Sequence, residues 1–190
     1  MIENKKTNEQ LLEEYLTNMG IDIEDPNFVE TPARIVRMHK EMLHGLTTNA
    51  SNEIKQILSK KFPSKTNKMI IFPNIQATAM CPHHLLPVKL KIWVAYIPDG
   101  QEVIGLSKIP RLVELLCKRP ILQEDLPDEI ADCLANNTSN LGVYVILKGR
   151  HSCMCDRGVK ARMKPVINST IRGNFKNDST RSEALKLMGF

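Results

Sequence analysis

VKLKIWVAY, residues 88–96, alternates apolar side chains with Lys89, Lys91 and Trp93. A repeat of two residues is typical of a β-strand that buries one face and exposes the other. Pro98-Asp99-Gly100 follows directly and has the composition of a turn. We therefore expect a half-buried strand that ends at this turn.

The segments on either side extend this pattern into a domain. Apolar residues at helical spacing predict two helices after the turn, and apolar runs predict three more strands. The helices are expected over residues 108–118 and 127–136, the strands over residues 69–75, 142–148 and 159–171, and a short helix after Phe175. This order predicts an α+β domain with an antiparallel sheet and helices on one face.

The N-terminal part carries helical signals. Thr7 and Gln10 have the spacing of a capping box, and an apolar stripe follows them, so a helix is expected over residues 7–19. A second helix is expected to begin at Thr31, with Thr31 as N-cap and Pro32 in the first helical position.

This second helix is expected to stop near Gly45. Residues 46–68 are then expected to form a polar connection with a short helix near residues 54–58. We therefore divide the chain into an N-terminal helical region, residues 1–68, and a sheet-bearing domain, residues 69–190.

Composition excludes some classes of protein. The 190 residues are 42% hydrophobic and 25% charged, which suits a folded domain. No apolar run reaches eighteen residues and the N-terminus has no signal-peptide core, so we expect a cytoplasmic protein without a membrane span. Five cysteines, an odd number, argue against a disulfide framework. The net charge of +5 fits an ordinary basic surface, a nucleotide phosphate partner or a nucleic acid.

Two short segments contain the residue types that bind zinc. Cys81-Pro82-His83-His84 and, seventy residues later, His151-Ser152-Cys153-Met154-Cys155 offer thiolate and imidazole ligands. A Cys-x-x-His pair can meet one ion from a single turn, and Cys153 can add a third ligand. Three protein ligands leave a fourth position for water, which is the catalytic arrangement. A closed site with Cys155 is the alternative; if the segment is a strand, Cys153 and Cys155 lie on opposite faces.

Other polar residues suit a nucleotide. Ser107, Lys108 and Arg111 lie at the expected start of a helix, where backbone N–H groups and cations favour phosphate. A buried Glu124, next to Gln123, can accept hydrogen bonds from the N1–H and amino group of a guanine, although from one sequence a solvent-facing acidic pair is the more common arrangement. Arg34 and Arg157 are isolated arginines whose ordinary explanation is surface charge.

Taken in order, these segments resemble the GTP cyclohydrolase I family over about residues 25 to 175. The matching motifs are Asp25-Pro26 with Thr31-Pro32-Ala33-Arg34, Cys81-x-His83-His84, Val94-Ala95-Tyr96-Ile97-Pro98, Ile104-Gly105-Leu106-Ser107-Lys108-Ile109, Arg119-Pro120-x-x-Gln123-Glu124, His151-x-Cys153-Met154-x-x-Arg157-Gly158, and Ser169-Thr170 with Gly173-x-Phe175. Each motif is modest alone, but the ordered set is specific.

The resemblance implies a role for individual residues. It implies Zn2+ as cofactor, with Cys81, His84 and Cys153 as ligands. It implies His83 and His151 as catalytic histidines and Ser107 as a further catalytic residue. It implies that GTP is held by Glu124, Gln123, Lys108, Arg111, Arg157 and, from a neighbouring subunit, Arg34.

The resemblance also implies a fold and an assembly. The family has the tunnelling fold, a four-stranded antiparallel sheet backed by two long helices, and forms a toroidal homodecamer with active sites between subunits. Closing sheets into a barrel by oligomerisation would remove open sheet edges. The implied reaction is hydrolysis of GTP at guanine C8 to formate and 7,8-dihydroneopterin triphosphate, for folate, biopterin or deazaguanine synthesis.

Two alternatives and one departure qualify the resemblance. Pro82 stands where the family commonly has Glu, which removes one carboxylate. Other tunnelling-fold enzymes are pterin synthases or a nitrile reductase, but the reductase does not use the Cys81, His84 and Cys153 set. A non-catalytic zinc protein that binds nucleic acid is disfavoured because aromatic residues make up only 5% of the chain.

Overall fold

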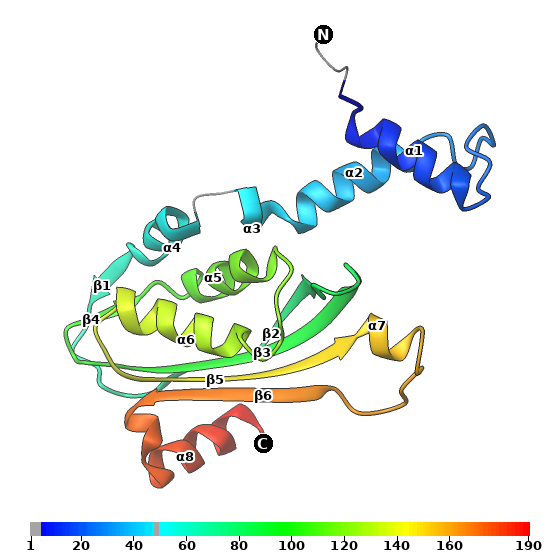
Figure 1. Ribbon diagram of the computed structural model, residues 1–190. Helices are drawn as coiled ribbons and strands as arrows, with labels where there is room; N and C mark the ends of the chain where they lie inside the picture. The colour runs from blue at the N-terminus through cyan, green and yellow to red at the C-terminus, as the bar shows by residue number, and fades with distance from the viewer. Residues whose placement is uncertain (1–4, 48–49) are drawn as a thin grey trace. The chain divides into compact units, whose positions relative to one another are not determined.

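The computed structural model describes residues 5–47 and 50–190, which divide after Leu43 into two compact units. Figure 1 shows helices alone in the first unit and a sheet with helices in the second. Residues 48–49 of the expected polar connection lie outside the described residues. The expected domain boundary after residue 68 stays a prediction.

The first unit contains α1 (Asn8–Asn18) and α2 (Thr31–Met42). The capping box is confirmed: the Gln10 backbone N–H donates to the Thr7 hydroxyl, and the Thr7 N–H donates to the Gln10 side chain. The start of α2 differs from the prediction by one residue. Glu30 is the N-cap and makes no side-chain capping bond, so Thr31 is already helical.

The second unit is built on a four-stranded antiparallel sheet in the order β2-β3-β5-β6. Its strands are β2 (Ile70–Met80), β3 (Pro87–Pro98), β5 (Asn140–His151) and β6 (Val166–Gly173). The segment of alternating residues lies in the inner strand β3, which pairs with β2 and β5. The expected half-buried strand is corrected, because Trp93 and Ala95, on the face opposite Val94, are also buried in an apolar cluster. The predicted α+β class and antiparallel sheet are confirmed.

Two strands differ from the sequence prediction. β2 continues five residues beyond the expected end at residue 75, because an irregularity between Phe72 and Ile75, with Asn74 at φ 55°, lets pairing with β3 resume. The expected strand over residues 159–171 is wrong in its first half, since β6 begins at Val166.

Helices cover both faces of the sheet. α5 (Lys108–Cys117) and α6 (Leu126–Asn137) confirm the two predicted helices and pack on one face with α4 (Ala50–Leu58) (Figure 1). α8 (Asp178–Met188) packs on the other face, where Trp93 and Tyr144 belong to a second apolar cluster. The expectation of helices on one face only is therefore corrected. Two further short elements of this unit are α3 (His44–Thr47) and the 3-10 turn η1 (Asn174–Lys176).

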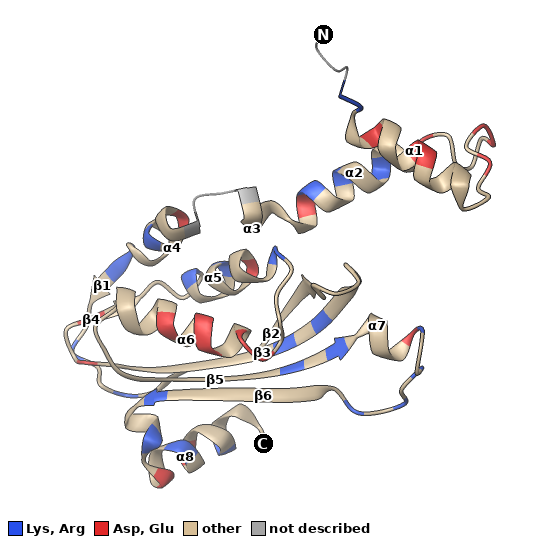
Figure 2. Cartoon of the chain, in the orientation of Figure 1, with Lys and Arg blue, Asp and Glu red and all other residues tan. Residues whose placement is uncertain are grey.

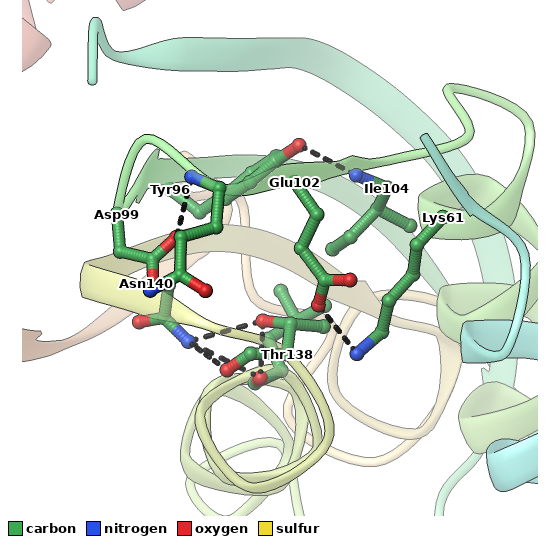
Figure 3. Close-up of polar contacts among 9 residues, drawn as sticks. Lys61, Tyr96, Asp99, Glu102, Ile104, Thr138 and Asn140 are labelled. Carbon is green, nitrogen blue, oxygen red and sulfur yellow. Dashed lines mark hydrogen bonds and ion pairs between the residues drawn. The ribbon is translucent and has the colours of Figure 1, made fainter. Parts of the chain in front are cut away.

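A small second sheet, β1 (Lys61–Pro63) with β4 (Glu102–Ile104), forms a corner at one end of β3. Figure 3 shows the buried Tyr96 hydroxyl accepting a hydrogen bond from the Ile104 N–H at 3.2 Å, and an ion pair between Lys61 and Glu102 at 2.6 Å. The Gly105 N–H also donates to the Lys60 carbonyl. These contacts fix the backbone that leads into α5.

Charged side chains hold the edge strand β6 against α6. Figure 2 shows acidic residues along α6. The Arg172 guanidinium contacts Asp128 at 2.7 Å and Asp132 at 2.9 Å, and the Thr170 hydroxyl donates to Asp128 at 2.6 Å. These bonds from Thr170 and Arg172 lower the pKa of Asp128.

Among the described residues, no helix is both long enough and apolar enough to cross a membrane.

Replacing Gly173 by Ala is expected to lower the free energy of unfolding by about 3 kcal/mol. Gly173 has φ +57°, and an added Cβ would lie 2.1 Å from the Leu141 carbonyl oxygen, so the backbone must move. Gly158→Ala is the matched control: φ is also +57°, but the nearest atom, the Cys153 carbonyl oxygen, is 4.0 Å away. The control should lose only about 1 to 2 kcal/mol. Urea unfolding at one protein concentration measures both, and equal losses would contradict the steric argument.

Candidate metal and nucleotide site

The sheet register brings the two zinc-type segments together. β2 ends at Met80 and β3 begins at Pro87, so Cys81 opens the connection between them. Val88 pairs with His151, the last residue of β5. The chain then turns into α7 (Ser152–Cys155), a single helical turn. The two segments, seventy residues apart in sequence, therefore meet at one end of the sheet.

Three side chains converge at this point. One ligand atom each from Cys81, His84 and Cys153 all lie within 4.8 Å of one another. The two sulfurs are 3.8 Å apart, and the Cys81 Sγ is 3.9 Å from the His84 Nδ1. Zinc–sulfur bonds of about 2.3 Å in a tetrahedral site separate two sulfurs by about 3.8 Å. Both the donor set and its spacing fit Zn2+.

A tight turn places the Cys81 end of this group. The Cys81 N–H donates to the Leu86 carbonyl and the Leu85 N–H donates to the Cys81 carbonyl, each at 2.9 Å. Leu85 has φ +51°, an unfavourable conformation for a leucine, which these two bonds hold in place. Cys81 is buried, whereas His83 and His84 are exposed. The turn thus presents two imidazoles at the surface above a buried thiol.

Cys153, a half-buried free thiol, lies against Cys81. Burial, followed by the hydrogen bond to Cys81, raises the pKa of the Cys153 thiol. A bound cation would act in the opposite direction and favour the thiolate, because metal binding displaces thiol protons. We call Cys81, His84 and Cys153 the convergent group. Among the described residues, Cys155 is not part of it. The segment is a helical turn and not the strand on which the opposite-face argument rested.

His151 lies beside the group and is held by an amide. Its Nε2 is 2.7 Å from the Oε1 of Gln123, a side chain only 4% exposed. The Gln123 Nε2 donates to the Val166 carbonyl at 3.0 Å and to the Asn168 Oδ1 at 2.6 Å. Burial lowers the pKa of His151, while the nearby carboxylate of Glu124 acts in the opposite direction.

The segment that contains Gln123 and Glu124 is tied to the same end of the sheet. The Ile121 N–H donates to the Met80 carbonyl at 3.1 Å, next to Cys81. Glu124 is exposed, and its charge is felt at His151. The positive charge of Arg157, also exposed, acts on Cys153. One carboxylate and one guanidinium therefore flank the convergent group.

The expected phosphate residues lie elsewhere on the same chain. Ser107 precedes α5 and makes no capping bond, and Lys108 begins the helix at the β4 corner. Lys108 and Arg111 line a surface pocket of about 420 Å³. Figure 1 shows β4 and α7 at opposite ends of the sheet.

The length of β3 separates the β4 corner, where α5 begins, from the convergent group. The Ile104 N–H contacts the Tyr96 side chain, and Tyr96 is eight residues along β3 from Val88, which faces His151. Eight strand residues span roughly 26 Å.

Arg34 belongs to the first unit, where its guanidinium pairs with Glu30 at 2.6 Å. The structure thus gathers Cys81, His83, His84, Gln123, Glu124, His151, Cys153 and Arg157 at one end of the sheet and Ser107, Lys108 and Arg111 at the other. Sequence reasoning missed Asn168 and Gly149, which shape the environment of Gln123. An asparagine inside an expected strand was the available signal for Asn168, since asparagine is depleted in strands.

Comparison with known proteins places these residues in a family context. The family model for GTP cyclohydrolase I matches residues 8–189. GTP cyclohydrolase 1 of Clostridium perfringens strain ATCC 13124 is 41% identical over 165 residues, covering 87% of this chain and 86% of the relative. That of Bifidobacterium longum strain NCC 2705 is 37% identical over 92% of this chain and 85% of its own length. That of Bacillus pumilus is 35% identical over 97% and 96%.

Among solved structures, an archaeosine synthase QueF-Like in the apo form aligns with a TM-score of 0.43 at 18% identity. That alignment covers 56% of this chain and 93% of the other.

Proposed function

The chain belongs to the GTP cyclohydrolase I family of hydrolases, and from this membership we propose the reaction that its own residues carry out. The reaction is zinc-dependent hydrolysis of GTP at guanine C8 to formate and 7,8-dihydroneopterin triphosphate. The observation that carries the proposal is the convergence of Cys81, His84 and Cys153 in a chain of this family.

Two thiolates and one imidazole would hold the ion and leave one position for a non-protein ligand. Zinc held in this way supplies the activation of water at neutral pH. Cys81 and Cys153 provide the charge that neutralises the cation, and the turn after Cys81 orients His84. Pro82 rigidifies that turn and leaves it without the carboxylate common in the family.

The chain's own residues handle the protons. His83 or His151 would protonate guanine N7, which makes C8 more electrophilic, and histidine titrates in the range that this exchange needs. Glu124 would accept hydrogen bonds from N1–H and the amino group, which orients the ring. Ser107 would assist proton transfer at the sugar during ring rearrangement. Gln123 lies next to Glu124 and contacts His151.

The triphosphate would be held by cations from more than one subunit. Lys108 begins α5 at the β4 corner, and the part of β3 between this corner and the convergent group spans roughly 26 Å, which supports the supply of Lys108 and Arg111 to one GTP by a second copy of the chain. Arg157 would act from the same chain as the thiols, and Arg34 from a neighbour. This separation supports the homodecamer of the tunnelling fold, a β-barrel toroid whose active sites lie at subunit interfaces.

Further properties follow from the same proposal. The product would enter tetrahydrofolate, biopterin or deazaguanine synthesis, in the cytoplasm, with residues 69–190 as the catalytic domain and residues 1–68 as a helical region. Neither nucleic acid nor membrane is expected as a partner.

The decisive experiment incubates the purified protein with GTP and Zn2+ and measures formate together with a fluorescent pterin after oxidation. The proposed reaction requires both products in equal amounts. A chain that binds zinc but releases no formate from GTP or dGTP would contradict it.

Glu124→Gln is expected to raise the KM for GTP about tenfold or more, because charge-assisted hydrogen bonds to guanine contribute about 1.5 to 3 kcal/mol. Asp125→Asn is the matched control, since Asp125 is the next residue and is also an exposed carboxylate. Its KM should stay at the wild-type value. Initial rates over a range of GTP concentrations decide the matter, and an unchanged KM in the Glu124 variant would remove this residue from guanine binding.

A further inference from the structure

We propose that Gln123 is a positioning residue, which holds the His151 ring with its hydrogen on Nε2 and leaves Nδ1 to exchange protons with the substrate. The inference rests on the proposed function only for the identity of that substrate. The position of the ring hydrogen follows from contacts within the chain.

The orientation of the Gln123 amide is fixed by its neighbours. Its Nε2 lies 3.0 Å from the Val166 carbonyl oxygen, which can only accept a hydrogen bond. The same nitrogen lies 2.6 Å from the Asn168 Oδ1. A flipped amide would set its oxygen against the Val166 carbonyl oxygen inside a site that is 4% exposed. The amide nitrogen therefore faces β6, and the amide oxygen faces His151.

The amide oxygen then determines the tautomer of His151. Gln123 Oε1 accepts hydrogen bonds and cannot donate them, so the His151 Nε2 at 2.7 Å must be the donor. A neutral imidazole carries one hydrogen, so its Nδ1 has the free lone pair. Nδ1 is thus the ring nitrogen whose lone pair stays available to a further hydrogen-bond donor.

The backbone makes room for this arrangement at Gly149. A Cβ on Gly149 would lie 1.9 Å from the Gln123 Oε1 and 2.7 Å from its amide carbon. Gly149 is paired with Val166 in the β5–β6 ladder, so the amide crosses the strand at a position without a side chain. A glycine in a strand weakens it, and here the close approach of Gln123 explains its presence.

All the hydrogen-bonding groups of the Gln123 amide are already in use, which distinguishes a positioning role from direct contact with the substrate. Both Nε2 hydrogens are used by Val166 and Asn168, and the oxygen is directed at His151. The side chain has no free donor for a purine. Loss of Gln123 should therefore slow the chemical step more than it weakens GTP binding.

The test uses full-length zinc-loaded protein labelled with 15N-histidine and solid-state NMR at a pH where the ring is neutral. The His151 signals are assigned by their absence in His151→Asn. Wild type should show a protonated Nε2 and an unprotonated Nδ1. In Gln123→Met and in Gly149→Ala this pattern should be lost, because the first removes the acceptor and the second displaces it. Gln76→Met, at an exposed glutamine of β2, is the control and should keep it.

Kinetics give the second readout. For both site variants kcat should fall about tenfold to a hundredfold, with zinc content unchanged and the KM for GTP within about twofold of wild type. A protonated Nδ1 in wild type would overturn the proposal, as would an unchanged His151 spectrum in both variants. A raised KM with normal kcat would make Gln123 a substrate contact instead. The NMR result does not depend on turnover, so a failure of the proposed reaction would be recognised separately.

Discussion

Cys153→Ala is expected to abolish both zinc binding and the release of formate from GTP. The Cys153 sulfur is 3.8 Å from that of Cys81, at the spacing of two thiolates on one zinc ion. Removing it leaves one thiolate and one imidazole, too few to hold the ion in a catalytic site. Turnover should fall by about a thousandfold or more, since metal activation contributes several kcal/mol and each 1.36 kcal/mol is a factor of ten.

Cys155→Ala provides the control within the same helical turn. Cys155 is also a half-buried free thiol, two residues away, but it lies outside the convergent group. This variant should keep its zinc and its rate. Metal analysis of gel-filtered protein and a formate assay measure both variants. A zinc-loaded, active Cys153→Ala protein would end the assignment, and loss of zinc in Cys155→Ala would point to a closed four-ligand site.

The contrast between residues 88–96 and residues 159–165 shows what alternation can predict. In the first segment, apolar residues alternate with lysines, and strands on both sides pair with it. The second segment alternates as regularly, with Val159 and Met163 set among basic residues. Yet β5 ends at His151 and offers no partner beyond Val166, so Val159 is 80% exposed. A period of two describes a strand only where a neighbour completes the ladder.

The site was predictable in its chemistry but not in its geometry. Thiol and imidazole groups at short spacing indicate Cys81, His84 and Cys153 as candidate zinc ligands, with Cys155 as a possible fourth. Their meeting depends on the pairing of Val88 with His151, and a shift of that register would move the ligands apart. The contacts of the Gln123 amide were even harder to predict from the sequence. Its partners are backbone and side-chain atoms of β6, and its space depends on the missing side chain of Gly149.

The separation of the two ends of the sheet has a consequence for assembly. Arg157 and Glu124 flank the thiols, whereas Lys108 and Arg111 belong to the β4 corner. In the proposed oligomer, each GTP would therefore use the thiol end of one subunit and the cationic corner of another. Two inactive subunits with defects at opposite ends should then restore each other.

Co-expression of a Cys153→Ala chain with a Lys108→Ala/Arg111→Ala chain is expected to recover activity that neither has alone. In randomly mixed oligomers, about one quarter of the sites combine an intact thiol end with an intact cationic corner. Differently tagged chains, purified through both tags, isolate the mixed oligomers for the formate assay. Co-expression of Cys153→Ala with His151→Asn is the control. Both defects then lie at the same end, so every shared site carries one of them and no recovery is expected. If the first mixture is as inactive as the control, each GTP is bound by one chain and the shared-site arrangement is wrong.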